Sequence, residues 1–168
     1  MSISMYSASV PVFVRALDNL AHVLKKGEAF AKEKGADADA LLQQRLIFDM
    51  LPLIKQIQIA CDMAARCAAR LAGAEPQSFE DNEKTLAEAY ARIERARAYV
   101  QSFKPEQIDG SEARAIKLKT RNGEQDFTGI EYLQGFTLPN LFFHCTTAYD
   151  ILRVAGAPLG KMDFIGSK

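Results

Sequence analysis

A hydrophobic repeat runs without interruption through residues 46–71 and strongly limits what this chain can fold into. Its apolar positions alternate steps of four and three: Leu46, Met50, Leu53, Ile57, Ala60, Ala64, Cys67 and Leu71. This spacing places all of them along one side of an α-helix, as in a helix that packs inside a bundle. We therefore expect a helix over residues 38–71, with a kink or a new start near residues 48–49 because Pro52 disrupts helical hydrogen bonding.

Three further segments show the same helical spacing of apolar residues. We predict helices over residues 10–34, 80–103 and 128–155, the second of them capped by Ser78 or Asp81. A tail over residues 160–164 is expected to pack back onto these helices.

The last predicted helix has a distinct start and an internal irregularity. Thr128 and Glu131 have the spacing of a capping box, in which each side chain bonds the backbone N–H of the other residue. Pro139 lies inside this helix, and we expect a kink there. In the tail, Phe164 is the side chain expected to contact the bundle.

Between residues 113 and 127 the hydrophobic period changes from helical to alternating. Ile116 and Leu118 alternate with lysines, and the dipeptide Asn122-Gly123 is a strong signal for a two-residue β-turn. Counting outward from that turn pairs Lys119 with Asp126 and Leu118 with Phe127. The sequence thus predicts an all-α fold: an up-down four-helix bundle, one domain over residues 1–168, with a small β-hairpin inserted between the third and fourth helices.

Composition excludes several classes of function. Basic and acidic residues number 21 each among 168, so the net charge is zero and there is no basic surface for nucleic acid. No apolar run reaches the roughly 18 residues of a membrane span, and the N-terminus lacks the features of a signal peptide. Cys61, Cys67 and Cys145 have no disulfide or metal-clip spacing. We expect a cytoplasmic protein with reduced cysteines that binds neither nucleic acid nor membranes.

Polar residues on the last predicted helix form a single stripe. Thr137, Asn140, His144 and Thr147 follow at steps of three, four and three, on a helix that is otherwise apolar nearly all round. Buried polar groups must find hydrogen-bond partners or water. Two interpretations stay open: a satisfied core network around a neutral histidine, or a pocket between helices in which His144 acts as a ligand or acid/base group.

Partners for this stripe are expected on the predicted second helix. Asp49 and Gln56 are seven residues apart and flank its apolar seam. A carboxylate beside a buried imidazole would orient it and raise its basicity, whereas Asp49 could equally reach water at the boundary. Asp62 is a further candidate away from the seam, and His22 is read as a surface histidine.

Several segments resemble a known family. They are residues 138–153 (LPNLFFHCTTAYDILR), the positions around Gly156 and Pro158 to Phe164, and on the second helix residues 49–53 and 56–62. Together they resemble a bacterial and fungal family of uncharacterised proteins, the "1993" domain of unknown function, within the DinB/YfiT-like superfamily of inferred metalloenzymes. The resemblance implies a four-helix bundle.

The resemblance also implies where a metal would sit. Metal-binding superfamily members hold a divalent metal with one histidine from the second helix and two, four residues apart, from the fourth. Counting back from Leu152-Arg153 places His144 at the second of the latter positions and Asn140 at the first. The predicted second helix has no histidine, so His144 and Asp49 are the ligands left for zinc, nickel or iron.

Three functions remain. The first is a small-ligand-binding domain in which a decayed metal site forms a polar pocket around His144, lined by Thr137, Asn140, Thr147 and Gln56. The second is a metal-dependent enzyme of transferase or hydrolase type, with His144 and Asp49 as catalytic residues. The third is a structural protein that forms a homodimer. We favour the first without a bound cofactor, and whether the chain is an enzyme stays open.

Overall fold

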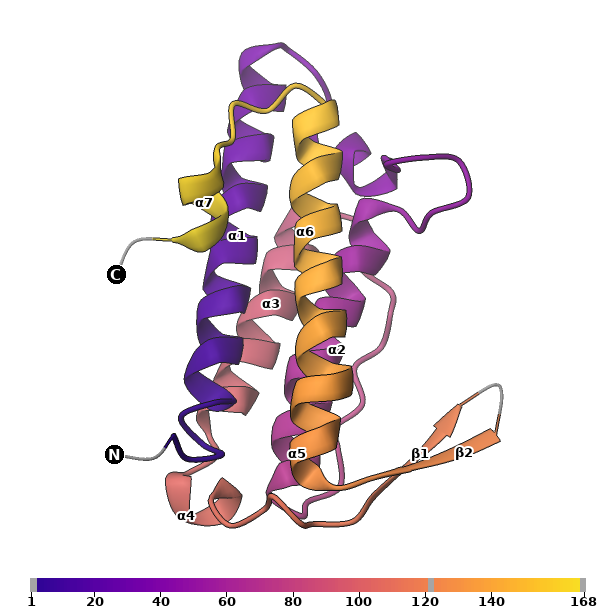
Figure 1. Cartoon of the computed structure of the whole chain (residues 1–168). Helices are drawn as coiled ribbons and strands as arrows, with labels where there is room; N and C mark the ends of the chain where they lie inside the picture. The colour runs from indigo at the N-terminus through magenta and orange to yellow at the C-terminus, as the bar shows by residue number, and fades with distance from the viewer. Residues whose placement is uncertain (1–2, 121–122, 167–168) are drawn as a thin grey trace.

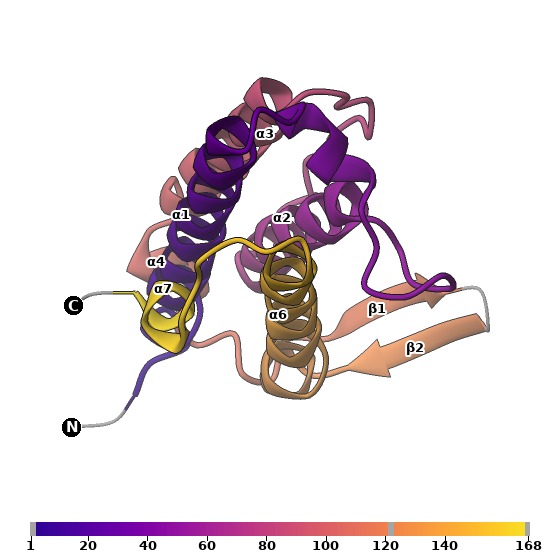
Figure 2. The ribbon, with the colours of Figure 1, turned by 90° about the horizontal axis from the view of Figure 1, so that it is seen from above.

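Four long helices pack around one hydrophobic core in a computed structural model that describes residues 3–120 and 123–166 (Figure 1). They are α1 (Val10–Glu33), α2 (Leu53–Leu71), α3 (Leu86–Gln101) and α6 (Leu138–Val154). Viewed from above, α2 lies between α3 and α6, and α1 touches α3 and α6 (Figure 2). The predicted all-α bundle with a small inserted hairpin is confirmed.

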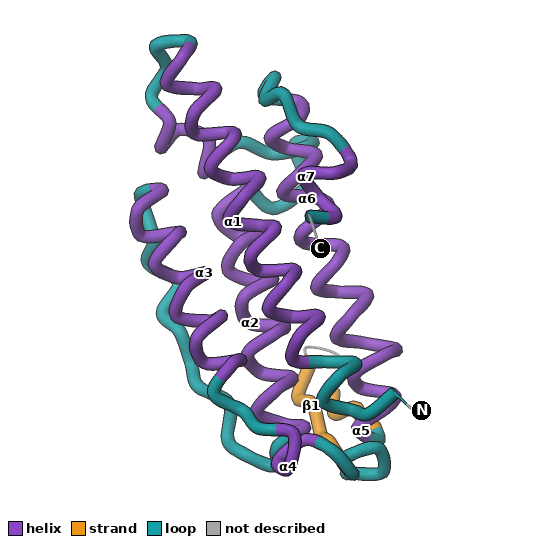
Figure 3. The backbone as a smooth tube through the Cα atoms, turned by 90° about the vertical axis from the view of Figure 1, so that its left-hand side faces the viewer, coloured by secondary structure: helices purple, strands orange, loops and turns teal. Residues whose placement is uncertain are grey.

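The four long helices do not alternate strictly in direction. After α2, residues 72–85 return along α3 without regular structure, so that α2 and α3 run in the same direction (Figure 3). α1 and α6 also run in the same direction, opposite to that pair (Figure 1). The directions are therefore up, down, down and up. Among the described residues no helix is both long and apolar enough to cross a membrane.

The predicted helix over residues 38–71 divides into two. A short 3₁₀-helix covers Ala38–Gln43, residues 44–52 form a loop, and α2 begins after Pro52. The residue before a proline is disfavoured in the helical conformation, and Pro52 itself cannot donate a backbone hydrogen bond. The new start thus lies at Pro52, three residues later than predicted, and Asp49 belongs to the loop.

The start of α3 also differs from the prediction. The helix begins at Leu86, and its cap is Thr85 in a capping box with Glu88, not Ser78 or Asp81. The later start of α3 is explained by the buried charge of Arg92, a residue of this helix. Arg92 has no exposed surface, and its guanidinium donates to the Glu80 carbonyl (3.0 Å) and to the Asp81 carboxylate (3.2 Å). These contacts hold the preceding segment in a non-helical conformation.

The hairpin forms where predicted but in a different register. Strand β1 (Ile116–Thr120) pairs with β2 (Gly123–Phe127), which places Ile116 opposite Phe127 and Lys117 opposite Asp126. The prediction had placed these pairs two residues later on the first strand. Gly123, at φ 113°, is paired with Thr120 and so begins the strand instead of forming the turn. Asn122 lies outside the described residues.

The segment leading into α6 combines α-helical and π-helical geometry. A short helix α5 (Gly129–Glu131) starts with the predicted capping box of Thr128 and Glu131. A π-helical turn follows over Tyr132–Thr137, immediately before α6. Pro139 cannot donate to the carbonyl four residues earlier, and the π-helical turn lies immediately before this proline's helix. Gly129 is needed here because a Cβ would lie 2.0 Å from the Ser111 carbonyl oxygen.

Two short helices complete the chain. α4 (Pro105–Ile108) closes the lower end of the bundle, and α7 (Lys161–Ile165) lies against α1 (Figure 1). Phe164 of α7 packs edge-on against Tyr149 of α6, with ring centroids 6.0 Å apart. The expected return of the tail onto the bundle is therefore confirmed.

Candidate functional site

His144 lies on α6 and faces α2. Its Nδ1 is 2.7 Å from Oε1 of Gln56, and the residue is 9% exposed. Gln56 sits in the first turn of α2, which runs antiparallel to α6 at this point (Figure 1). The two helices thus join one imidazole and one amide across the bundle.

A second hydrogen bond fixes the proton on the imidazole. Nε2 of Gln56 donates to the backbone carbonyl of Leu51 at 2.9 Å, and a carbonyl can only accept. The amide oxygen must therefore be the atom that faces His144, and Nδ1 must carry the proton. Burial lowers the pKa of His144 from its usual value of 6.5, so the ring is neutral at physiological pH. The lone pair then resides on Nε2.

Nε2 of His144 is the ring nitrogen that takes no part in these hydrogen bonds. It has no hydrogen bond within residues 3–120 and 123–166, and it is not one of the fully buried polar atoms that lack a partner. The atom therefore reaches solvent. Phe143 packs edge-on against the imidazole at 5.2 Å and is itself 55% exposed. Exposed Ile47, Phe48 and Leu51 belong to the neighbouring loop.

Asn140 and Thr147 of the predicted stripe bond within their own segment, whereas Oγ1 of Thr137 has no hydrogen-bond partner within the described residues. Nδ2 of Asn140 donates to the Phe136 carbonyl at 2.6 Å, and Oγ1 of Thr147 donates to the Phe143 carbonyl at 2.8 Å. Thr137 is fully buried beside Cys67. Asn140 is one turn before His144 and shares its face of the helix.

Asp49 does not take the place expected for it. It is exposed in the loop of residues 44–52, and the Nδ1 position of His144 is occupied by Gln56. The expectation that Asp49 and Gln56 lie on one helix fails because Pro52 ends the loop and begins α2. Among the described residues, Gln56 is the one that hydrogen-bonds to the imidazole.

The surroundings of His144 do not fit a transition metal. Within the described part of the chain, no three His, Cys, Asp or Glu side chains gather closely enough to hold an ion. Zinc sites in proteins use at least three such ligands. The donor set here is one imidazole, and the amide of Gln56 already serves that imidazole.

Asp62 belongs to a separate buried ion cluster. Its carboxylate accepts from Arg92 at 2.6 Å and pairs with Arg66 at 2.7 Å. Glu83, also buried, lies 3.2 Å from Arg92 and accepts from Gln58 at 2.7 Å. Burial by itself lowers the pKa of Arg92, but the two carboxylates outweigh that effect and raise it. The cluster fastens residues 80–83 to α2 and α3.

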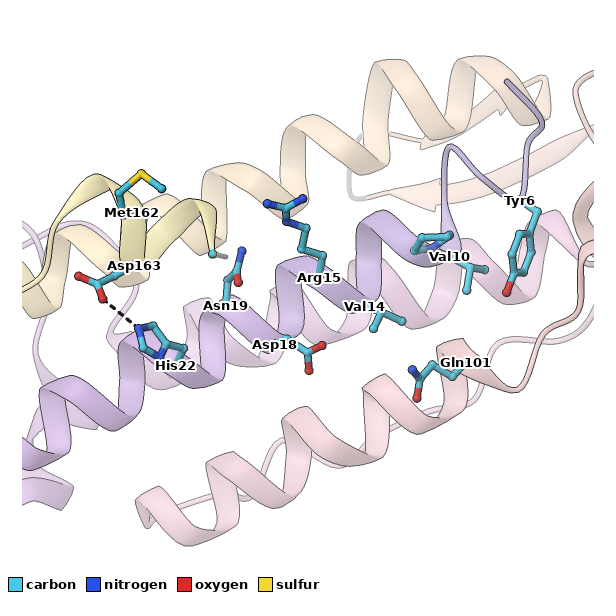
Figure 4. Close-up of a pocket in the computed structure, with 12 residues that line it drawn as sticks. Tyr6, Val10, Val14, Arg15, Asp18, Asn19, His22, Gln101, Met162 and Asp163 are labelled. Carbon is cyan, nitrogen blue, oxygen red and sulfur yellow. Dashed lines mark hydrogen bonds and ion pairs between the residues drawn. The ribbon is translucent and has the colours of Figure 1, made fainter. Parts of the chain in front are cut away.

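A second polar stripe, on α1, was not recognised in the sequence. Arg15, Asn19, His22 and Lys26 follow at steps of four, three and four. Figure 4 shows the first three on the side of α1 that faces α7, and Lys26 contacts Asp163 of α7. His22 is partly exposed, as predicted for a surface histidine, and lies 2.9 Å from Asp163. Lys26 contacts the same carboxylate at 2.9 Å. The helical spacing of these four residues was the signal available in the sequence.

Two cavities flank this α1 stripe. One, of about 1040 Å³, opens between α1, α3 and α7 (Figure 4). The other, of about 420 Å³, lies between α1, α6 and α7 and includes Cys145 in its wall. Burial raises the pKa of the Cys145 thiol to about 12, which makes it a packing residue and a poor nucleophile.

Comparison with known proteins gives a consistent assignment. The family model described as a domain of unknown function, DUF1993, matches residues 5–165. The crystal structure of a DinB family member protein from Shewanella denitrificans superimposes with a TM-score of 0.89 and 38% sequence identity, over 97% of this chain and 92% of that one. The search of curated proteins gave no match. This chain therefore belongs to the DUF1993 family and has the fold of a DinB family member.

Proposed function

We propose that this protein is a small-ligand-binding bundle in which Nε2 of His144 accepts a hydrogen bond from the ligand. The observation that supports this function is the series of hydrogen bonds from the Leu51 carbonyl through Gln56 to His144. It uses two helices to hold one neutral imidazole in one tautomer, with its lone pair directed to solvent. A histidine needed only for packing would not require its second nitrogen to stay accessible.

The surroundings of the imidazole favour a ligand with an apolar body and one hydrogen-bond donor. Phe143 contacts the ring, and exposed Leu51 supplies the carbonyl that orients Gln56. A neutral imidazole nitrogen accepts from hydroxyl or N–H groups, and aromatic faces add stacking or edge contacts. Phenol combines both properties and serves as a simple probe.

Nitrogen-15 NMR of the two histidine side chains tests the proposal. Without ligand, His144 is expected in the tautomer protonated at Nδ1. Phenol should shift the Nε2 resonance of His144 in a saturable manner and leave His22, which pairs with Asp163, unchanged. Equal shifts of both histidines, or a His144 ring protonated at Nε2 without ligand, would contradict the proposal. His22 is thus an internal control in the same spectrum.

Self-association is a second candidate function, supported by one observation. Phe48 is 88% exposed at the tip of the loop of residues 44–52, near partly exposed Ile47. Large apolar side chains gathered on one surface often mark an interface between proteins. Sedimentation equilibrium of the wild type and of Phe48→Ser tests this function. A dimer that Phe48→Ser converts to a monomer supports it, and a wild-type monomer at high concentration rejects it.

A further inference from the structure

An apolar cavity lies on the side of α6 opposite to α2. It measures about 420 Å³, within the range of roughly 300–1,000 Å³ of small-molecule sites. Its walls come from three helices: Ala16, Leu20 and Val23 of α1, Phe142 and Cys145 of α6, and Phe164 of α7. Nothing in the proposed role of His144 uses this space.

Two polar side chains of α1 line the same cavity. Nε and Nη2 of Arg15 donate to the Ile165 carbonyl at 3.2 and 3.0 Å. One turn along the helix, Nδ2 of Asn19 donates to the carbonyls of Phe164 and Ile165, both at 2.9 Å. These carbonyls belong to the last residues of α7, where no helical donor follows. We call this group of contacts the C-terminal latch.

Arg15 lines the cavity and has no acidic partner among the described residues. His22 and Lys26 share Asp163, and Asp18 lies 2.6 Å from Arg97. Within residues 3–120 and 123–166, Arg15 forms no ion pair, and its partner is a neutral carbonyl. A guanidinium binds a carboxylate through two parallel hydrogen bonds about twice as strong as those to neutral acceptors. A carboxylate would therefore compete well with the Ile165 carbonyl.

The C-terminal latch depends on a close contact between Gly166 and Asn19 and on a short helix, α7. Gly166 ends α7 at φ 77°, a conformation that favours glycine, and a Cβ at that position would lie 2.3 Å from Oδ1 of Asn19, so that side chain would have to move. α7 itself has only five residues and is joined to α6 by an irregular connection. Loss of the two carbonyl contacts would leave α7 held by the ion pairs of Asp163 with His22 and Lys26 and by the packing of Phe164 on Tyr149.

We propose that this cavity binds an aliphatic monocarboxylate. The alkyl chain lies among Leu20, Val23 and Phe142, and the carboxylate replaces the Ile165 carbonyl on Arg15. Asn19 donates to the second carboxylate oxygen. Binding thus releases the C-terminal latch, and α7 acts as a lid that responds to the ligand.

Isothermal titration calorimetry of the full chain with decanoate, below its micelle concentration, tests the proposal. We expect saturable binding with one decanoate per chain. Binding should weaken at least about tenfold in Arg15→Gln, because a charged hydrogen bond contributes about 1.5–3 kcal/mol and each 1.4 kcal/mol is a factor of ten. Decanol, which has the same chain without the charge, should bind as weakly to the wild type as decanoate binds to Arg15→Gln.

Two further variants make the result specific. Ala16→Leu narrows the cavity and should abolish binding while Arg15 remains, and Lys32→Gln, on the same helix but outside the cavity, should bind as the wild type does. His144→Ala should also bind decanoate normally, which separates this site from the one on α2 and α6. No saturable heat with wild type, or equal affinity for decanoate in Arg15→Gln, would overturn the proposal.

Discussion

The tautomer of His144 depends on a residue of another helix. Gln56 can present its oxygen to the imidazole because Leu51 holds its amide nitrogen, and Leu51 lies in the loop that Pro52 ends. A carboxylate at position 56 would instead favour the charged imidazolium. Gln56→Glu should therefore raise the pKa of His144 from its lowered value, and NMR titration of the ring protons measures the change. A pKa that stays unchanged or falls would show that position 56 does not control the ring.

The same histidine makes stability depend on pH. Burial lowers the pKa of His144 below the 6.5 of an unfolded chain, so between these two values the unfolded state binds more protons. Stability from this group is complete above about pH 6.5 and declines as the pH falls toward the folded-state pKa. Urea unfolding between about pH 8 and pH 5 should show a steeper loss in the wild type than in His144→Gln. An equal dependence of the unfolding free energy on pH in the two proteins would contradict the assignment of a buried neutral ring to His144.

At the scale of single elements, the segment before α3 depends on Arg92. This buried guanidinium contacts Asp62, Asp81 and Glu83, and the last of these is itself buried. Its removal leaves Glu83 without its main counter-charge. Arg92→Ala should lower the free energy of unfolding by about 3–5 kcal/mol, as measured by urea denaturation.

Arg95→Ala is the matched control for that substitution. Arg95 also contacts Glu83, at 3.4 Å, but its side chain is 59% exposed. An exposed ion pair contributes about 0–1 kcal/mol, so this variant should unfold nearly as the wild type does. Similar losses in the two variants would mean that burial of Arg92 is not what matters.

The attachment of α7 depends on Asp163. Hydrogen bonds from Lys26, from the Gly160 N–H and from His22 hold the pKa of Asp163 well below its usual value, so the carboxylate stays charged at neutral pH. Asp163→Asn should speed amide hydrogen exchange in residues 161–165 and leave exchange in α2 unchanged. Asp126→Asn, which removes an exposed pair with Lys117, is the control. Amide exchange in α7 that is as slow in Asp163→Asn as in the wild type would show that the ion pairs do not hold this helix.

These elements also show what the sequence could predict. α1 and α6 end close to where periodicity places them, because both have long apolar faces that pack into the core. The start of α3 was missed because a tertiary contact of Arg92 overrides local helix preference. The hairpin register was missed because Gly123 belongs to the strand. Local patterns do not contain either piece of information.

The same contrast applies to the candidate site. The stripe of Asn140, His144 and Thr147 is visible in the sequence because helical spacing alone defines it. The sequence does not show whether Asp49 or Gln56 is the partner of His144, because that depends on where the loop of residues 44–52 ends. The absence of an acidic partner for Arg15 among the described residues could be found only once α7 was placed on α1.

At the scale of the whole molecule, α6 separates two different surfaces. Toward α2 it presents His144, and toward α1 it forms one wall of the apolar cavity. The fold is that of a DinB family member, yet His144, at the position that resembles a metal ligand, contacts the amide of Gln56 and the ring of Phe143. We therefore propose ligand binding, not metal chemistry, as the role of His144.

Elemental analysis of protein purified without an affinity tag tests that assignment most directly. The measurement compares the wild type with His144→Ala, before and after incubation with zinc, nickel and iron salts followed by dialysis. Our account predicts that zinc, nickel and iron stay far below one ion per chain and that the two proteins do not differ. Near-stoichiometric metal in the wild type that is lost in His144→Ala would contradict it.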